Sequence, residues 1–419
     1  MNKNVILEVL MKCNRCGLCQ EVCPTYRVSG NEFAVARGRN RLIRMAIEGQ
    51  LEFDKEPEIE QFINECLLCK ACETNCPSGV PTPELISQVR EYYTSTKGLP
   101  IAKKIMYRGV FSHNKRIDLV RRLAKVYQKT GIKTLVRMTG VNNIFNKADD
   151  MLPDLPKNSV RGQLPMLLKN IHQPKYKVAY FLGCSVNNFF SSIGVATIKV
   201  LQKNSCQIIV PDVNCCGAPH NSAGDQREFK RLAIKNLKEL AKLDPDAIIV
   251  DCSTCGSILK EYVGLFENEP EYQKLAKQIA EKVKDISSFL IEIGFKKEMG
   301  EIKARVTYHD PCHGVRFLNV QEAPREILKS IPGIELIEMN EADMCCGGAG
   351  SYSIFYPKLS RQILSRKINN FKKTGASILA TSCPACTMQL SFGMKLHELT
   401  SPVKHPVELL AEAYDNKAK

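Results

Sequence analysis

The sequence predicts an α+β multi-domain protein, in which a mainly helical N-terminal domain precedes two copies of an α/β domain. Two observations carry this prediction. Two cysteine-rich runs lie within residues 13–77, and the segment between them has helical periodicity. After residue 174, a pattern of strand, cysteine loop and helix occurs twice, with equivalent cysteines offset by 128, 130 and 131 residues. The 419 residues allow roughly two to four domains.

We expect four parts along the chain. Residues 1–96 form the helical domain, 97–174 a basic helical linker with an extended connector, and 175–300 and 301–419 the two α/β copies. Strand, loop and helix alternate in each copy, which predicts parallel sheets. The first copy is expected to have strands at 178–182, 206–210 and 247–250 and a helix at 229–243. The second is expected to have strands at 306–308, 335–339 and 376–380 and a helix at 359–373.

The basic linker carries most of the net charge. Between Lys97 and Arg137 there are twelve Lys or Arg and one acid, so this segment contributes +11 of the total +15. An amphipathic helix is expected at 117–130, and its apolar side is Leu119, Val120, Leu123, Val126 and Tyr127. Packing on the next domain, an acidic partner and an anionic membrane surface all fit this helix. Residues 151–174, rich in proline, predict the extended connector.

The 19 cysteines define the chemical class. An odd count in a large chain without a recognisable secretory signal argues against a disulfide scaffold. No window approaches the roughly 18 apolar residues of a membrane span. We therefore expect a cytoplasmic protein, with peripheral contact at the inner face of the membrane through 97–137 as one option. No nucleic-acid-binding motif accompanies the basic charge, so no nucleic acid partner is expected.

The two N-terminal runs have the spacing of bacterial ferredoxins, Cys-x-x-Cys-x-x-Cys-x-x-x-Cys-Pro, which binds cubane 4Fe–4S clusters. In two-cluster ferredoxins, the fourth cysteine of each run binds the other cluster. Zinc is the alternative, but zinc sites normally use two well-separated Cys-x-x-Cys pairs. The expected ligands are Cys13, Cys16, Cys19 and Cys76 for one cubane, and Cys66, Cys69, Cys72 and Cys23 for the other.

Between the runs, a helix is expected at 35–50. Its arginines are Arg37, Arg39, Arg41 and Arg44. They either offset the negative charge of the clusters or form a solvated helix face.

Each α/β copy contributes a lone cysteine, a Cys-Cys-Gly and a Cys-x-x-Cys. This pattern resembles the cysteine-rich CCG-domain iron–sulfur proteins related to heterodisulfide reductase. The resemblance implies two noncubane 4Fe–4S clusters, each bound by five cysteines. The implied ligands are Cys184, Cys215, Cys216, Cys252 and Cys255 in the first copy, and Cys312, Cys345, Cys346, Cys383 and Cys386 in the second. Glycine after each cysteine pair is expected to let the backbone approach the cluster.

The whole chain resembles two relatives, the iron–sulfur subunit of glycolate oxidase or lactate-utilising enzymes, and the D subunit of heterodisulfide reductase. The first is favoured by Gly38, Pro153 and the motifs beginning at Tyr308 and His405. It implies an electron-transfer subunit of a 2-hydroxy-acid dehydrogenase, with FAD on a partner subunit and a quinone, electron-transfer flavoprotein or membrane subunit as acceptor. The second implies reduction of a disulfide at the noncubane clusters.

Three histidines lie beside cluster cysteines in the sequence. His309, His313 and His220 either bond sulfur or relay a proton, or are packed histidines at strand ends. We regard His309 and His313 as the catalytic candidates. Cys206, within an apolar strand, is expected to be a buried hydrophobe. The glycines that follow Cys346 do not form a dinucleotide-binding fingerprint, so no flavin or nicotinamide site is expected on this chain.

Overall fold

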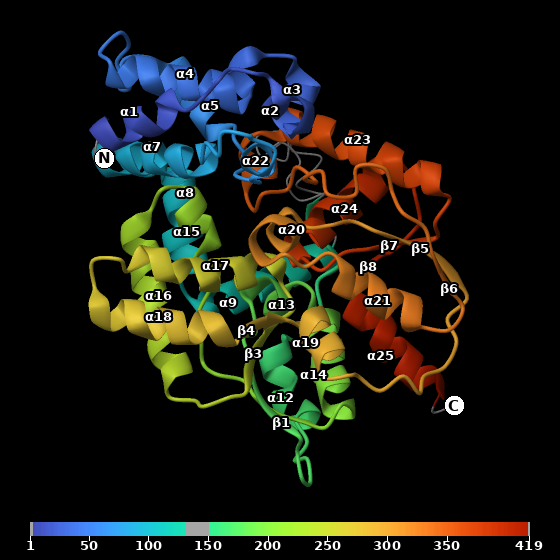
Figure 1. Cartoon of the computed structure of the whole chain (residues 1–419). Coiled ribbons are helices and arrows are strands. Elements are labelled where there is room, and N and C mark those ends of the chain that lie inside the picture. The colour runs from blue at the N-terminus through green and yellow to red at the C-terminus, as the bar shows by residue number, and fades with distance from the viewer. Residues whose placement is uncertain (1–2, 131–150, 418–419) are drawn as a thin grey trace.

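A computed structural model describes residues 3–130 and 151–417. An N-terminal group of helices covers one end of two α/β domains, which lie side by side beneath it (Figure 1). The protein therefore has the α+β multi-domain architecture expected from the sequence.

The N-terminal part is entirely helical among its described residues. Its elements are α1 (Lys3–Met11), α2 (Leu18–Val22), α3 (Pro24–Ser29), η1 (Glu32–Ala34), α4 (Ala36–Ile47), α5 (Pro57–Asn64), α6 (Ala71–Thr74) and α7 (Thr82–Lys97). Apolar side chains from α1, α4, α5 and α7 form its core, among them Ile6, Ile43, Ile63 and Ile86. Position 38, within α4, requires glycine because a Cβ there would overlap the carbonyl of Glu32. The short helices α2, α3 and α6 adjoin the two cysteine runs.

The linker forms α8 (Ile101–Lys104), the π-helix η2 (Ile105–Phe111) and α9 (Asn114–Lys129). The expected helix at 117–130 is thus present, but its apolar side does not pack on the next domain. Leu119 and Leu123 are 55% and 61% exposed, whereas Ile117 and Arg121 are buried. Arg121 donates hydrogen bonds to Asp118 and to two carbonyls of the connector, so its buried guanidinium attaches α9 to the connector. The last basic residues of the segment, 131–137, lie outside the described residues.

The sequence predicted an extended connector, but part of it forms the helix α12 (Val160–Leu167). Ser159 begins this helix by accepting a hydrogen bond from the Gly162 N–H. Val160 is fully buried in the core of the first copy. Proline at position 165 is tolerated in a helix of only eight residues, near its C-terminal end.

The first α/β copy has a four-stranded parallel sheet in the order β2-β1-β3-β4. Its strands are β1 (Tyr176–Tyr180), β2 (Cys206–Ile209), β3 (Ala247–Val250) and β4 (Val283–Asp285). Its helices are α13 (Cys184–Asn188), α14 (Ser191–Lys203), α15 (Ala218–Ser222), α16 (Gln226–Ala241), α17 (Ser253–Leu265), α18 (Pro270–Lys282) and α19 (Ile286–Glu292).

The second copy repeats this topology in the order β6-β5-β7-β8. Its strands are β5 (Ala304–Tyr308), β6 (Ile334–Leu336), β7 (Ile378–Ala380) and β8 (Val403–Lys404). Its helices are α20 (Cys312–Leu318), α21 (Glu322–Ser330), α22 (Tyr352–Phe355), α23 (Pro357–Thr374), α24 (Pro384–Leu396) and α25 (Pro406–Lys417). The sequence did not predict β4 or β8, because strands of two or three residues are too short to show a period.

The two copies share their hydrophobic cores. One cluster joins Val178 and Tyr180 of the first sheet to Val306 and Tyr308 of the second. The strand ends also meet directly, since the Ser253 N–H donates to the carbonyl of Ser382 at 3.1 Å. The carboxyl ends of β3 and β7, where the Cys-x-x-Cys motifs begin, are therefore neighbours.

Candidate metal centres

The two N-terminal cysteine runs fold into the same turn. Arg15 and Leu68 precede the second cysteine of each run with φ of 54° and 53°, and Gly17 and Lys70 follow it with φ of 89° and 58°. Paired left-handed residues curl the chain around its own interior, so three cysteines of one run face a common centre. The same unusual backbone in both runs explains why one spacing occurs twice.

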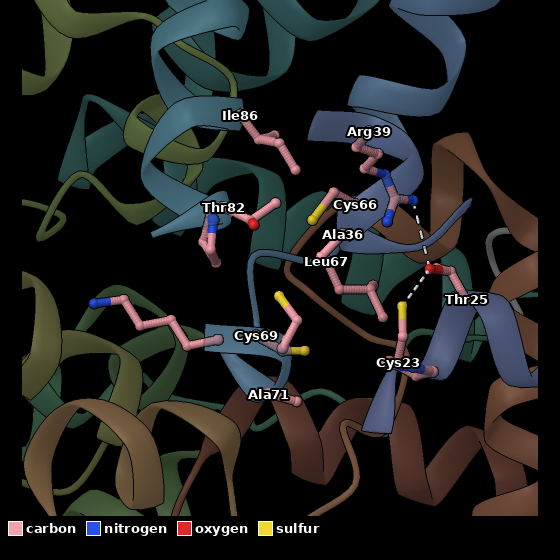
Figure 2. A pocket seen from close by; sticks show the side chains of 14 residues that line it. Cys23, Thr25, Ala36, Arg39, Cys66, Leu67, Cys69, Ala71, Thr82 and Ile86 are labelled. Atoms are coloured by element: carbon pink, nitrogen blue, oxygen red, sulfur yellow. Dashed lines mark hydrogen bonds between the residues drawn. The ribbon is translucent and has the colours of Figure 1, made fainter. Parts of the chain in front are cut away.

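Each run encloses a cavity, and each cavity receives the last cysteine of the other run. One cavity is lined by Cys13, Cys16, Cys19 and Cys76, and also by Cys72. The other is lined by Cys23, Cys66, Cys69 and Cys72 (Figure 2). The structure thus brings together both predicted sets of four. Four sulfur donors around one enclosed space suit a cubane cluster.

Two of the four expected arginines lie at these cavities. Arg39, only 2% exposed, borders the second cavity beside Cys66 and Thr25 (Figure 2). It donates hydrogen bonds to the carbonyls of Ala34 and Phe62. Arg37 borders the first cavity and donates to the Arg15 carbonyl. Arg41 is exposed, and Arg44 pairs with Glu48 near the surface. The helix therefore places Arg37 and Arg39 beside the cysteine sets and Arg41 on the solvated face, and the effect of the first two on cluster charge stays a prediction.

A further buried arginine escaped the sequence analysis. Arg90 of α7 donates to the carbonyls of Cys66, Ile63 and Asn64, and also to the Ser222 carbonyl of the first copy at 2.8 Å. It therefore holds the start of the second run and fixes the helical domain on its neighbour. The sequence signal for its burial was its position in the apolar stripe of α7, between Val89 and Tyr93.

In the first copy, the five predicted cysteines converge from the carboxyl ends of β1 and β3 and from the loop after β2. Cys184 Sγ lies 3.8 Å from Cys215 Sγ. Cys216 is hydrogen-bonded to Cys215 and Cys255, and these bonds lower the pKa of its thiol to about 5. Cys255 is in turn hydrogen-bonded to Cys252. All five therefore form one continuous sulfur cluster.

The second copy assembles its five cysteines in the same way. Cys346 Sγ lies 3.6 Å from Cys386 Sγ, and Cys345 is hydrogen-bonded to both Cys312 and Cys346. Those bonds lower the pKa of Cys345, whereas bonds to Cys346 and Cys383 together with burial raise the pKa of Cys386. Several thiolates cannot share so small a buried volume unless cations compensate their charge. The donor set therefore fits a cluster that supplies several iron atoms.

The glycines after the cysteine pairs have a reason that differs from the one expected. Gly217 and Gly347 adopt φ of 94° and 81°, which other residues rarely adopt. A Cβ on Gly217 would lie 2.5 Å from the Phe229 ring, and one on Gly347 would lie 3.0 Å from the Ser360 carbonyl. Left-handed backbone and the closely packed following helix thus require glycine at both positions.

The four cysteine sets are arranged in one row. Cys69, from the second N-terminal run, packs in one apolar cluster with Cys345 of the second copy, beside Cys312. Cys383, at the other side of that copy's set, is hydrogen-bonded to Cys252 of the first copy. The order is therefore first run, second run, second copy and first copy.

The three histidines have different surroundings. His309 is fully buried, and its ring lies within the second copy's sulfur cluster. His313 instead crosses to the first copy, where its Nδ1 lies 2.6 Å from Ser257 Oγ, and stacks on Phe317. His220 has partners at both nitrogens, Ser112 and Asp225, and holds the loop after Cys216. Cys206 is buried in β2, apart from the four sets.

Comparisons with known proteins identify the family. A cysteine-rich domain model matches residues 178–260 and 306–391, and a 4Fe-4S dicluster domain model matches residues 9–80. The model of the glycolate oxidase iron-sulfur subunit linker region matches residues 98–152. The probable glycolate oxidase iron-sulfur subunit of Bacillus subtilis is 35% identical over 97% of this chain and 95% of its own length. The chain belongs to the family of glycolate oxidase iron–sulfur subunits.

Other relatives are less similar in sequence. The glycolate oxidase iron-sulfur subunit of Escherichia coli is 25% identical over 98% of this chain and 95% of its own length. Lactate utilization protein A of Shouchella clausii is 29% identical, and it aligns with 56% of this chain and 98% of its own length. These matches make the chain an iron–sulfur subunit of an oxidoreductase, and they favour iron–sulfur clusters over zinc.

The fold also occurs in a solved structure. The crystal structure of a hypothetical protein from Helicobacter pylori superposes with a TM-score of 0.54 at 9% identity, over 90% of this chain and 68% of that chain. This likeness concerns the fold alone. Among the described residues, no helix is both long and apolar enough to cross a membrane.

Proposed function

We propose that this chain is the electron-transfer subunit of a flavin-dependent 2-hydroxy-acid dehydrogenase that oxidises glycolate, lactate or a similar acid. The single observation that carries the proposal is the unbroken row of four cysteine sets. FAD belongs to a partner subunit in this proposal, because residues 3–130 and 151–417 contain no dinucleotide-binding fingerprint. Clusters bound by these sets exchange one electron at a time, whereas oxidation of a hydroxy acid releases two.

We assign one cubane to each N-terminal set and one noncubane cluster to each five-cysteine set. The protein's own groups perform three tasks in this arrangement. The cysteines of each set bind its cluster. Arg39 and Arg90 place positive charge and hydrogen-bond donors beside the second run. The packing of Cys69 against Cys345 excludes water between two sets. The first run is the exposed end of the row, since Cys16 is exposed to solvent, and it is the contact point proposed for the flavoprotein.

The test is purification of the complex together with the products of the neighbouring genes, under anoxic conditions. We expect a flavoprotein to co-purify, and glycolate or lactate to bleach the visible absorption of the clusters. A complex without flavin, whose absorption no hydroxy acid changes, contradicts the proposal. Four clusters correspond to about sixteen irons per chain, so an iron count tests the cluster content separately.

A second candidate is disulfide reduction, favoured by the contact between Cys252 and Cys383. Two five-cysteine sets that touch can act on the two sulfur atoms of one substrate. Turnover of a disulfide that is lost in Cys345→Ser, but kept in Cys206→Ala, supports this candidate. Absence of turnover with small and peptide disulfides eliminates it.

The exposed side of α9 favours a membrane or quinone-reducing partner at the other end of the electron path. Leu119, Leu123 and Val126 are exposed there, beside the exposed cations Arg116 and Arg122. This combination is typical of helices that lie in the headgroup region of anionic membranes. Pelleting with phosphatidylglycerol vesicles is expected to decrease with salt and in Leu123→Glu, whereas equal pelleting with neutral vesicles contradicts the contact. An electron-transfer flavoprotein as the acceptor is the alternative outcome.

A further inference from the structure

The environment of His309 distinguishes the second five-cysteine set from the first. A ring nitrogen of His309 and the sulfurs of Cys346 and Cys386 all lie within 4.8 Å of one another, and all three side chains are buried. Register identifies the matching residue in the first copy. Tyr308 pairs with Ala380 as Tyr180 pairs with Ile249, so His309 corresponds to Phe181. Phenylalanine offers no ligand atom.

The hydrogen bonds of His309 decide which nitrogen is available. Its Nδ1 lies 3.1 Å from the Ala342 carbonyl oxygen, and an oxygen of this kind can only accept. Nδ1 therefore carries the proton. Nε2 consequently presents a lone pair.

The lone pair of Nε2 has no hydrogen-bond partner among the described residues, although the ring is fully buried. Leaving such an atom unpaired costs about 1–3 kcal/mol. Buried polar atoms are nearly always paired, so an orphan indicates an absent partner. Since Nε2 accepts and cannot donate, that partner is a hydrogen-bond donor or a metal ion.

The carbonyl that orients the ring is itself held by two further hydrogen bonds. The Ala342 carbonyl also accepts hydrogen bonds from the Asp310 N–H at 3.1 Å and from Lys367 Nζ at 3.2 Å. Lys367 is fully buried and corresponds to Asn236 of the first copy, which supports the equivalent loop through the Cys215 carbonyl. Histidines that bind metals usually donate their other ring N–H to a carbonyl or carboxylate. His309 already has this arrangement.

We propose that Nε2 of His309 is an iron ligand in the second five-cysteine set, which then offers five thiolates and one imidazole. The first set offers thiolates alone. The inference rests on the proposed iron–sulfur content of the second set. Imidazole nitrogen is a common iron ligand. In this proposal the two copies hold clusters with different ligand sets.

The test is pulsed electron paramagnetic resonance of the reduced protein, produced with ¹⁴N-histidine and with ¹⁵N-histidine. We expect one strongly coupled histidine nitrogen in the wild type and its loss in His309→Phe, which copies Phe181. The iron count per chain stays unchanged in that variant because all five cysteines remain.

His405→Gln is the matched control. His405 is equally buried, but its Nδ1 accepts a hydrogen bond from the Val407 N–H. Nε2 of His405 therefore carries the proton and cannot bind iron as it stands. The nitrogen coupling is expected to persist in this variant. His309→Asn, with a smaller side chain, replaces His309→Phe if the larger ring prevents folding.

The outcomes separate the two proposals. A full iron count without a strongly coupled histidine nitrogen in the wild type refutes iron ligation and leaves the proposed function intact, and so does a coupling that persists in His309→Phe. If replacing Cys345 and Cys346 by serine removes no iron, the second set holds no cluster. Both the cluster assignment and the ligation are then wrong.

Discussion

The two α/β copies have the same backbone topology and the same five cysteines, yet they differ at four buried polar positions. The first copy buries the acids Asp251 and Asp285, where the second has Ser382 and His405. The second copy buries His309 and Lys367, where the first has Phe181 and Asn236. The arrangement of strands depends on the cysteines and the apolar core, whereas the local charge depends on a few polar positions.

The difference matches the positions of the copies in the row. The second copy lies between the helical domain and the first copy, and Arg27 of the helical domain pairs with its Glu341 at 2.9 Å. In the proposed arrangement, the buried Lys367 cation of the second copy stabilises a reduced, more negative cluster, whereas the buried Asp251 and Asp285 of the first copy destabilise one. The two copies of this fold thus contain cysteine sets with different buried polar surroundings.

The largest expected effect concerns the order of the row. Cys345→Ser should prevent reduction of the first copy's cluster by the flavoprotein and a hydroxy acid, because the second copy lies between them. Cys215→Ser should leave the second copy reducible. Freeze-quenched electron paramagnetic resonance of both complexes measures this, with Cys206→Ala as control. Equal reduction of the first copy in Cys345→Ser means that its electrons take another route.

A second comparison concerns the glycines after each cysteine pair. Gly217→Ala should cost about 2–4 kcal/mol of unfolding free energy, from a strained φ together with a clash against Phe229. Gly347→Ala should cost about 1–2 kcal/mol, since the nearest contact is 3.0 Å. Denaturant unfolding under anoxic conditions tests the ranking. Equal losses imply that backbone strain alone decides both sites.

The smallest effect is a pH dependence from a buried acid that the second copy lacks. Burial raises the pKa of Asp251 to about 6, above the 3.8 of an exposed carboxyl. The folded state therefore holds its proton more tightly, and stability is highest below pH 3.8 and falls as pH rises through 6. This group should cost about 1 kcal/mol between pH 5 and pH 7.5.

Asp251→Ser copies Ser382, which accepts a hydrogen bond from Tyr308 as Asp251 does from Tyr180. This variant should remove the contribution of Asp251 to the slope of stability against pH. It should leave the contribution of Asp285, whose pKa is also raised to about 6 by burial. Thermal unfolding at several pH values measures both slopes. A variant with the wild-type slope shows that Asp251 is not the group responsible.

The cysteine spacing was sufficient to predict the four sets, the exchange of the fourth cysteine between the N-terminal runs, and the duplicated parallel sheets. These features depend on local spacing and on repeats, which a single chain displays directly. The structure gathers each predicted set, including Cys76 with Cys13 and Cys23 with Cys66. The short strands β4 and β8 and the helix α12 were beyond this reasoning, because pairing and burial create them.

The sequence by itself determined the chemistry, because cysteine type and spacing dictate what a loop can bind. Only the tertiary structure decided which sets are neighbours and which nitrogen of His309 is free. It also showed that α9 exposes its apolar side and that Lys367 replaces Asn236 beside a cysteine pair. These properties depend on contacts between residues far apart in the chain, such as Cys69 with Cys345 and Cys252 with Cys383, and local spacing carries no record of them.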